Sequence, residues 1–216
     1  MVRDRKRALD AGWTARELRI LRRLDSPVRI QAYLDSLAYD PVPGTASPRR
    51  VMRERKANCF EGALFAAAAL RRLGDPPLVI DMYAVDDDDH VIAVYRRAGR
   101  WGALGKSNFT TLRSREPVYH TVRELVMSYF DFYMNLYGYL SLRSFSRPVS
   151  LARFDRLRWM TTEEDLEAIG DYLTNLRHFR VVAPANVRRL NHATPALLES
   201  SLLGADRAGL YVPRKK

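Results

Sequence analysis

Cys59 is the only cysteine in a chain of 216 residues, and its sequence neighbourhood favours chemistry. Asn58 precedes it and Glu61 follows Asn58 by three residues, which is the spacing of a capping box at a helix start. Cys59 is therefore predicted to lie in the first turn of a helix, where free amides and the helix dipole stabilise a thiolate. Because the thiolate is the nucleophilic form, this position indicates a reactive cysteine. The alternative is a small buried side chain that only fills space in an alanine-rich helix.

A nucleophilic thiol needs a base within hydrogen-bond reach, and His90 is the candidate. It begins a predicted strand directly after four aspartates at residues 86–89, whose carboxylates favour the charged imidazolium. These residues predict a thiolate–imidazolium pair. A third polar group orients the imidazole in comparable sites, and Ser107 and Asn108 on the next strand are the two candidates.

Several helices must position these side chains, and capping chemistry marks their starts. Thr14, Ser26-Pro27 and Ser47-Pro48 each open a predicted helix, because Ser and Thr accept free amides and Pro suits the first helical position. The Cys59 helix is predicted over residues 58–73, is rich in alanine and ends at Gly74. Its small side chains allow close approach to neighbouring elements, which predicts a central, buried helix.

Short strands are predicted to follow this helix. They occupy residues 78–85, 90–97 and 100–107, and a turn at Ala98-Gly99 joins the last two as a hairpin. The predicted fold class is therefore α+β, with the Cys59 helix packed on an antiparallel sheet.

The second half of the chain is predicted to be mainly helical. One helix covers residues 121–140, where aromatic residues at near-helical spacing indicate core packing. Thr161 and Glu164 form a capping pair that opens another helix, and a short strand follows at residues 179–183. The predicted organisation is a single domain over residues 1–216, with a catalytic core at 26–119 and a mainly helical extension at 120–216.

The order of these features resembles a known superfamily. The segments NCFEGALFAAAALRRLG and DDDDHVIAVYRRAGRWGALGKSN are similar to the transglutaminase-like branch of the papain-type cysteine enzymes. The resemblance covers roughly residues 26–119. It implies a papain/transglutaminase-like core in which a thiolate attacks an amide or ester carbonyl, forms an acyl-enzyme and transfers the acyl group to water or an amine. The implied substrate is a peptide or protein, and we expect no cofactor and no metal.

The chain departs from this superfamily at the third catalytic position. Members commonly place Asp four residues after the strand tryptophan, and here Gly105 follows Trp101 at that distance. Strand alternation puts Ser107 on the same face as Gly105, whereas Asn108 is chemically the better partner for an imidazole but has the opposite parity. For the oxyanion hole, the backbone amide of Cys59 is the default donor, and Gln31 is an alternative.

The charge balance bears on possible partners. The chain has 36 basic and 25 acidic residues, a net charge of +11 that attracts polyanions. The basic residues are spread along the chain and do not alternate with aromatics in one nucleic-acid motif, which favours a solvated basic surface. The basic stretch at residues 143–158 is interleaved with aromatics and could face an acidic partner.

Two functions follow from these observations. The first is a cysteine hydrolase or acyltransferase, and the alternative is a catalytically inactive binding module of the same fold for nucleic acid or an acidic protein. A single cysteine excludes an intramolecular disulfide and a cysteine-cluster metal site. No apolar run approaches the ~18 residues that a membrane span requires, so we expect a cytoplasmic protein without a membrane partner. The sequence does not indicate an oligomeric state.

Overall fold

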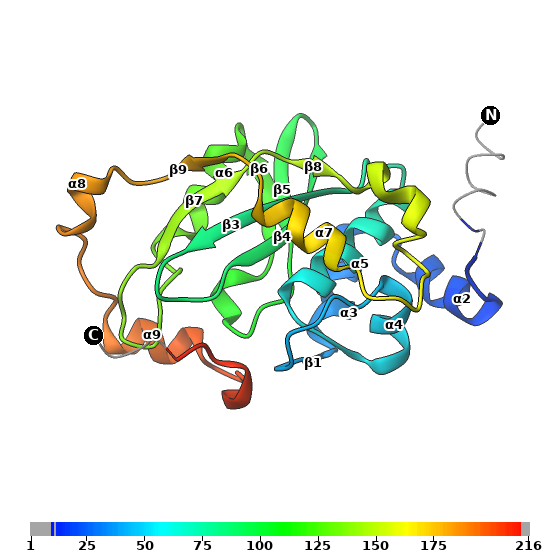
Figure 1. Ribbon diagram of the computed structural model, residues 1–216, viewed down its shortest axis with the longest axis horizontal. Coiled ribbons are helices and arrows are strands. Elements are labelled where there is room, and N and C mark those ends of the chain that lie inside the picture. Colours follow the sequence, from blue (N-terminus) through cyan, green and yellow to red (C-terminus); the bar gives the residue numbers. More distant parts are fainter. Residues whose placement is uncertain (1–9, 11, 213–216) are drawn as a thin grey trace.

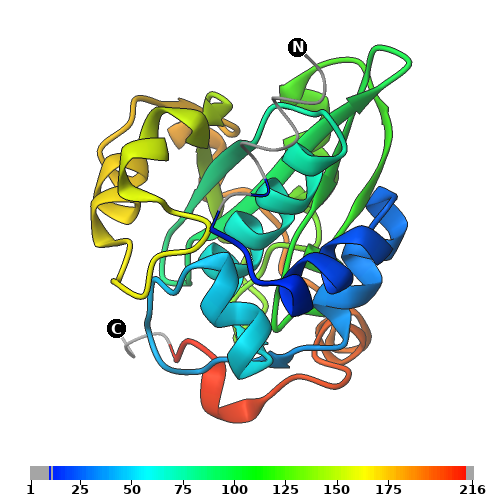
Figure 2. The same cartoon turned by 90° about the vertical axis from the view of Figure 1, so that its right-hand side faces the viewer.

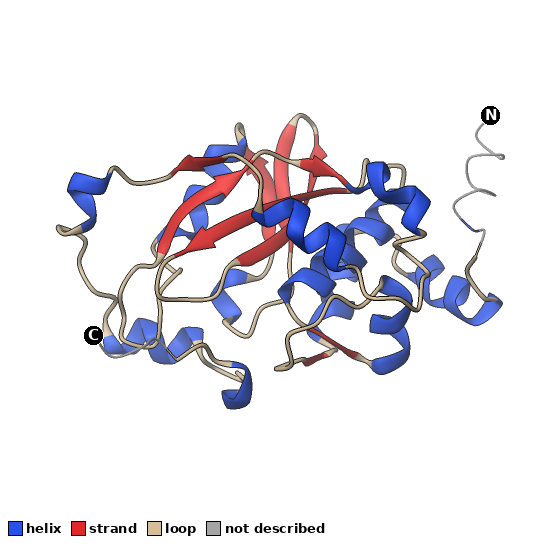
Figure 3. Cartoon of the chain, viewed as in Figure 1, coloured by secondary structure: helices blue, strands red, loops and turns tan. Residues whose placement is uncertain are grey.

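A seven-stranded antiparallel sheet forms the centre of the protein (Figures 1 and 3). The computed structural model describes residues 10 and 12–212, and the basic stretches at residues 3–7 and 213–216 lie outside them. The strands are β1 (Ala38–Tyr39), β2 (Lys56–Ala57), β3 (Leu78–Ala84), β4 (His90–Arg97), β5 (Arg100–Leu104), β6 (Arg115–Tyr119), β7 (Leu142–Ser146), β8 (Val149–Ser150) and β9 (His178–Arg180). The large sheet has the order β6-β5-β4-β3-β7-β9, with β8 also paired to β3, while β1 and β2 form a separate parallel pair. The predicted α+β class and the β4-β5 hairpin are confirmed.

Helices cover both faces of this sheet (Figure 2). The helices are α2 (Ala15–Arg23), α3 (Pro27–Asp35), α4 (Pro48–Glu54), α5 (Cys59–Arg72), α6 (Val122–Phe130), α7 (Glu167–Thr174), α8 (Pro184–Val187) and α9 (Pro195–Ser201), with 3-10 turns η1 (Thr110–Leu112), η2 (Leu151–Leu157) and η3 (Arg207–Gly209). Alternate residues of β3 point to opposite faces, so Val79 packs in the α5 cluster and Ile80 in the α6 cluster. The sheet therefore separates two hydrophobic clusters, and α5 occupies the centre of the larger one.

The start of α5 is built as the sequence predicts. The Asn58 side chain accepts the amide of Glu61, and the Glu61 side chain accepts the amide of Asn58, which completes the capping box. The alanines of α5 are almost fully buried, and the helix packs against β4 and β3. The prediction of a central helix on an antiparallel sheet, with Cys59 at its first position, is confirmed.

The predicted helix over residues 121–140 is wrong in its second half. Helix α6 ends at Phe130, and the chain then turns. The Asn135 side chain accepts the amides of Tyr137 and Tyr139, and Gly138 takes a φ of +80°. These local hydrogen bonds compete with the helical ladder and stop it.

Residues 120–212 supply helices α6 to α9, as the prediction of a mainly helical extension at residues 120–216 requires, but their structure is not only helical. This half of the chain supplies β7, β8 and β9 to the central sheet. Thr161 and Glu164 do not cap a helix, because α7 begins at Glu167 and the amide of Leu166 is bonded to Thr45 instead. Long-range strand pairing and loop contacts override the local helix signals here.

A membrane-spanning helix is absent from residues 10 and 12–212, since none of their helices combines the required length and hydropathy.

Gly62 in α5 gives a test of this packing. A Cβ at Gly62 would overlap the Cβ of Lys106, whose side chain is buried and bonded to the carbonyl of Leu37. We expect Gly62→Ala to lower the free energy of unfolding by ~1–3 kcal/mol, measured by urea denaturation. Gly170→Ala in α7 is the matched control, because its Cβ would meet atoms only at 4.0 Å. The control should be neutral or stabilising by up to about 1 kcal/mol through helix propensity, and equal effects of the two changes would contradict this packing.

Candidate active site

The four residues singled out from the sequence, Cys59, His90, Ser107 and Asn108, line one cavity of about 40 Å³. They come from the start of α5, the start of β4 and the loop after β5. The cavity is further lined by Tyr39, Asp87, Asp88, Asp89, Phe109, Leu112, Tyr133, Gly209 and Tyr211. The fold therefore brings together residues that are far apart in the chain.

Cys59 is half-buried at the first position of α5. Its thiol donates to the carbonyl oxygen of Asp89 at 3.6 Å. The helix start is fixed by Glu61, which also accepts the amide of Ala46 at 2.9 Å and so ties the preceding loop to α5. The α5 start is thereby fixed against the loop before α4, and the sulfur lies next to the residue that precedes β4.

His90 is buried at the first position of β4, and its ring is oriented by a backbone carbonyl. Nε2 lies 2.8 Å from the carbonyl oxygen of Leu112. Because a carbonyl can only accept, Nε2 carries the proton and Nδ1 carries the lone pair. The nitrogen that remains available to take a proton from a thiol is therefore Nδ1.

The absence of a side chain at Gly105 explains why a backbone carbonyl is the hydrogen-bond partner of Nε2 of His90. A Cβ at Gly105 would lie 3.5 Å from Nε2 of His90, so a side chain at this position would face the ring. Glycine offers none, and the ring bonds instead to Leu112 of η1. No side-chain pattern could have revealed Leu112, because its contribution is a backbone oxygen.

Neither Ser107 nor Asn108 bonds the imidazole. The Ser107 hydroxyl accepts the amide of Phe109 at 3.1 Å. The Asn108 side chain donates to the carbonyl of Asp206 at 2.7 Å and accepts the amide of Asp206 at 2.8 Å. Strand β5 ends at Leu104, before these residues, so strand alternation no longer sets the direction of their side chains. The expected role of orienting the ring is filled by Leu112.

Gln31 does not line the Cys59 cavity; it binds the backbone of Gly105, next to the cavity. Its carboxamide donates to the carbonyl of Gly105 at 2.9 Å and accepts the amide of Gly105 at 3.1 Å. It also donates to Asp35 at 3.0 Å. These bonds occupy the side chain that the sequence offered as an oxyanion-hole donor, which leaves the backbone amides at the α5 start for that role.

The thiol and the imidazole are both neutral at pH 7 in this structure. Burial raises the pKa of Cys59 to about 11, against the smaller effects of the Val91 and Phe60 amides, which lower it. Burial lowers the pKa of His90 to about 4, and the Leu112 carbonyl opposes this shift. The predicted thiolate–imidazolium pair is therefore not present.

The aspartate run does not act as the sequence indicated. The negative charge of Asp88 contributes to the raised pKa of the Cys59 thiol, so it opposes thiolate formation. Asp87 accepts the hydroxyl of Ser141 at 2.6 Å, and Asp89 accepts the amide of Ala84 at 2.8 Å. Burial raises the pKa of Asp87 to about 7. These carboxyl groups accept hydrogen bonds around the β3-β4 turn, and they do not raise the pKa of the His90 imidazole.

Tyr133 is a site residue that sequence reasoning assigned to core packing. Its hydroxyl donates to the carbonyl of Asp88 at 2.7 Å, and its ring meets that of His90 edge-on at a centroid distance of 6.4 Å. It forms one wall of the cavity. Helical spacing concealed it, because the chain is not helical at Tyr133.

A larger hollow of about 470 Å³ lies between α3 and the β5-β6 edge and includes neither Cys59 nor His90.

Among the described residues, no cluster of three His, Cys, Asp or Glu side chains is placed to hold a metal ion. His178 lies 3.4 Å from a buried carboxylate oxygen of Asp81.

Comparison with known proteins adds no family to these observations. The sequence matches no protein-family model, and no curated protein matches it. The resemblance to papain-type enzymes therefore stays a prediction from the sequence segments alone.

The raised pKa of Cys59 can be measured directly. We expect the ultraviolet thiolate absorbance of the protein, with Cys59→Ala subtracted, to titrate near pH 11, well above the ~8.5 of a free cysteine. Because the folded state holds this proton more tightly than the unfolded state does, the free energy of unfolding should fall as pH rises through the interval from 9 to about 11. This fall should be smaller in Cys59→Ala. A thiolate already formed at pH 7 would contradict the neutral pair.

Proposed function

We propose that this chain is a cysteine-dependent hydrolase or acyltransferase with a papain/transglutaminase-like core, acting on an amide bond of a peptide or protein. One observation carries the proposal. The Cys59 thiol, at the start of a helix, shares a cavity with His90, whose Nε2 is bonded to the Leu112 carbonyl and whose Nδ1 can accept a proton. A nucleophile and an oriented base are the two groups that acyl transfer through a thioester requires.

The reaction follows from these groups. Nδ1 of His90 takes the thiol proton of Cys59 as the sulfur attacks the substrate carbonyl carbon. Free amides at the α5 start stabilise the oxyanion. The imidazolium then returns the proton to the leaving amine, and a thioester forms on the sulfur. Water or a second amine, deprotonated by Nδ1, attacks the thioester and releases the acyl product and the thiol.

The Leu112 carbonyl determines the tautomer of His90 and how strongly its imidazolium form is stabilised. It fixes the tautomer as a carboxylate would, but it is uncharged and stabilises the imidazolium less. With both groups neutral at rest, we infer that proton transfer accompanies attack on the carbonyl and does not precede it.

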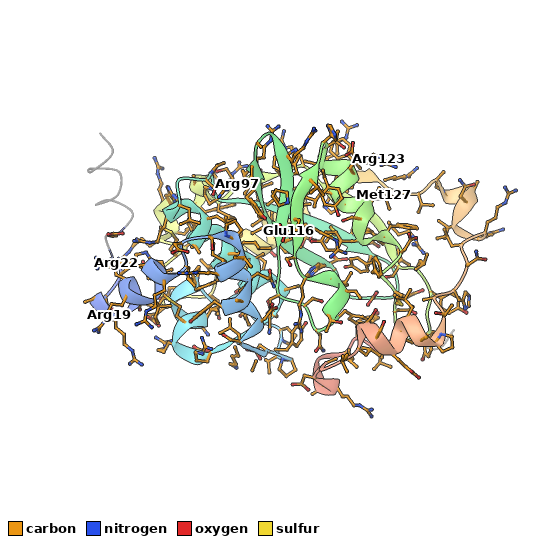
Figure 4. The ribbon with its side chains drawn as sticks, turned by 180° about the vertical axis from the view of Figure 1, so that it is seen from behind. Arg19, Arg22, Arg97, Glu116, Arg123 and Met127 are labelled. Carbon is orange, nitrogen blue, oxygen red and sulfur yellow. The ribbon has the colours of Figure 1, made fainter. Side chains whose placement is uncertain are left out.

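The alternative is a catalytically inactive, basic binding module of the same fold, for nucleic acid or an acidic protein. The neutral resting pair and the net charge of +11 are the observations in its favour. Against it, Arg19 and Arg22 lie at one end of the molecule and Arg123 lies far from them on α6, with Glu116 between (Figure 4). Arg97 is paired with Asp75 at 2.6 Å. A dispersed and partly neutralised surface is weak support for a dedicated polyanion site.

The catalytic proposal is tested with an activated ester such as p-nitrophenyl acetate, with the acyl-enzyme detected by mass spectrometry. We expect Cys59→Ala to form no acyl-enzyme. His90→Ala should lower the acylation rate by ~10²–10⁴, the usual contribution of a general base. His120→Ala is the matched control, since this exposed histidine is bonded to Arg100 and lies outside the cavity. Equal acylation of the His90 and His120 variants would exclude His90 as the base.

The binding alternative predicts a different dependence on salt. If the basic excess is only a solvated surface, binding to DNA or RNA should be weak, independent of sequence and lost steeply as salt rises. Fluorescence anisotropy with a labelled oligonucleotide measures this. Tight binding that survives moderate salt, and that is abolished by joint Ala substitution of Arg153, Arg156 and Arg158, would favour the binding module over the enzyme.

A further inference from the structure

The Cys59 cavity is partly covered by a distant part of the same chain, residues 200–211, which we call the cover segment. Gly209 and Tyr211 line the cavity. Figures 1 and 2 show the chain from α9 onward, in orange to red, running along one end of the molecule beside β1. Gly209 packs so closely on Tyr39 of β1 that a Cβ there would lie 2.6 Å from its ring. The remaining space of about 40 Å³ holds roughly three water molecules.

Asn108 holds the cover segment by its backbone. The carboxamide bonds both the amide and the carbonyl of Asp206, at 2.8 and 2.7 Å. The Asp206 side chain takes no part, since it accepts the amide of Ala208 at 3.0 Å. A donor–acceptor pair that engages both backbone groups of one residue binds extended chain regardless of its side chain there, as in other peptide-recognition sites.

The rest of the cover segment is attached loosely. Thr110 donates to the carbonyls of Ser200 and Ser201, both at 3.1 Å, and Ser201 is fully buried. Leu203, by contrast, is 75% exposed. A segment with few buried apolar side chains opens at low cost in free energy. The cover segment can therefore leave while the sheet and α5 stay folded.

We propose that the cover segment occupies the place of a peptide substrate, and that Asn108 binds the backbone of a peptide residue with the extended conformation of Asp206. The inference deepens the proposed function and rests on it for the identity of the site. It assigns Asn108 to substrate binding, in place of the role in orienting the imidazole. In the resting protein the substrate site is then occupied by the chain's own residues 206–211, which a peptide must displace to reach Cys59.

Opening has a chemical consequence at the dyad. Burial is the largest cause of the raised pKa of Cys59 and of the lowered pKa of His90. Water that enters an open cavity relieves burial of both groups. Proton transfer from the thiol to the imidazole then becomes easier.

The cover is tested by the alkylation rate of Cys59 with iodoacetamide, a reagent that must pass the cover segment to reach the thiol. Gly209→Ala should displace the segment, because its new methyl group overlaps Tyr39. We expect alkylation to rise about tenfold or more, a factor that corresponds to about 1.4 kcal/mol in the opening equilibrium. Ala208→Ser is the matched control, which adds one atom at an exposed position of the same turn and should alkylate at the wild-type rate. Circular dichroism verifies that both variants are folded.

The peptide site is tested by adding a synthetic peptide with the sequence of residues 200–212, SSLLGADRAGLYV, to the Gly209→Ala protein. The peptide should slow alkylation towards the wild-type rate, and a scrambled peptide of the same composition should not. Asn108→Leu keeps the side-chain shape without hydrogen bonds. It should accelerate alkylation in the absence of peptide and abolish the protection when peptide is added.

Each result decides a different claim. Equal alkylation of Gly209→Ala and wild type overturns the cover. Faster alkylation without protection by the peptide, or protection that persists in Asn108→Leu, overturns the peptide site. Protection by the peptide in a protein that forms no acyl-enzyme from esters supports the peptide site and rejects the proposed catalysis, so the two failures are distinguishable.

Discussion

The buried carboxylate of Glu61 is the interaction on which the site depends. It accepts the amide of Asn58, which completes the cap of α5, and it accepts the amide of Ala46, which fixes the loop before α4. Gly44 passes so close that a Cβ there would lie 3.0 Å from the same carboxylate. A carboxylate at a helix N-terminus also interacts favourably with the dipole. Because these bonds converge on one side chain, they fix the start of α5, and with it Cys59, relative to the loop before α4.

Burial and reactivity oppose each other at this site. The enclosure that fixes Cys59 and His90 also keeps both neutral, since each charged form would lose its hydration. A resting thiol with a raised pKa is protected from alkylation and oxidation, because those reactions require the thiolate. On the proposed function, the Cys59 thiol therefore reacts only after water or a substrate has entered the cavity in place of the cover segment.

The sequence predicted the parts of the fold that local chemistry determines. The capping box at Asn58, the end of the helix at Gly74 and the hairpin turn at Ala98-Gly99 each depend on neighbours a few residues away, and all are present. The four candidate residues of one cavity also followed from element order. The strand predicted at residues 179–183 overlaps β9, whereas β7 and β8 were missed because they are short and pair with the distant strand β3. The contacts of Leu112 and Asp206 were missed because they use backbone atoms, which carry no signal in residue type.

Gly105 connects these observations. Since it has no side chain to offer the imidazole, the orientation of His90 depends on the carbonyl of Leu112, the last residue of η1. The same short stretch holds the cover segment through Asn108 and Thr110. A side-chain acid on the sheet would have kept the base oriented independently of the cover. With a loop carbonyl in that role, the segment that partly covers the cavity and the group that orients the base are attached to the same five residues, 108–112, and movement of one is transmitted directly to the other.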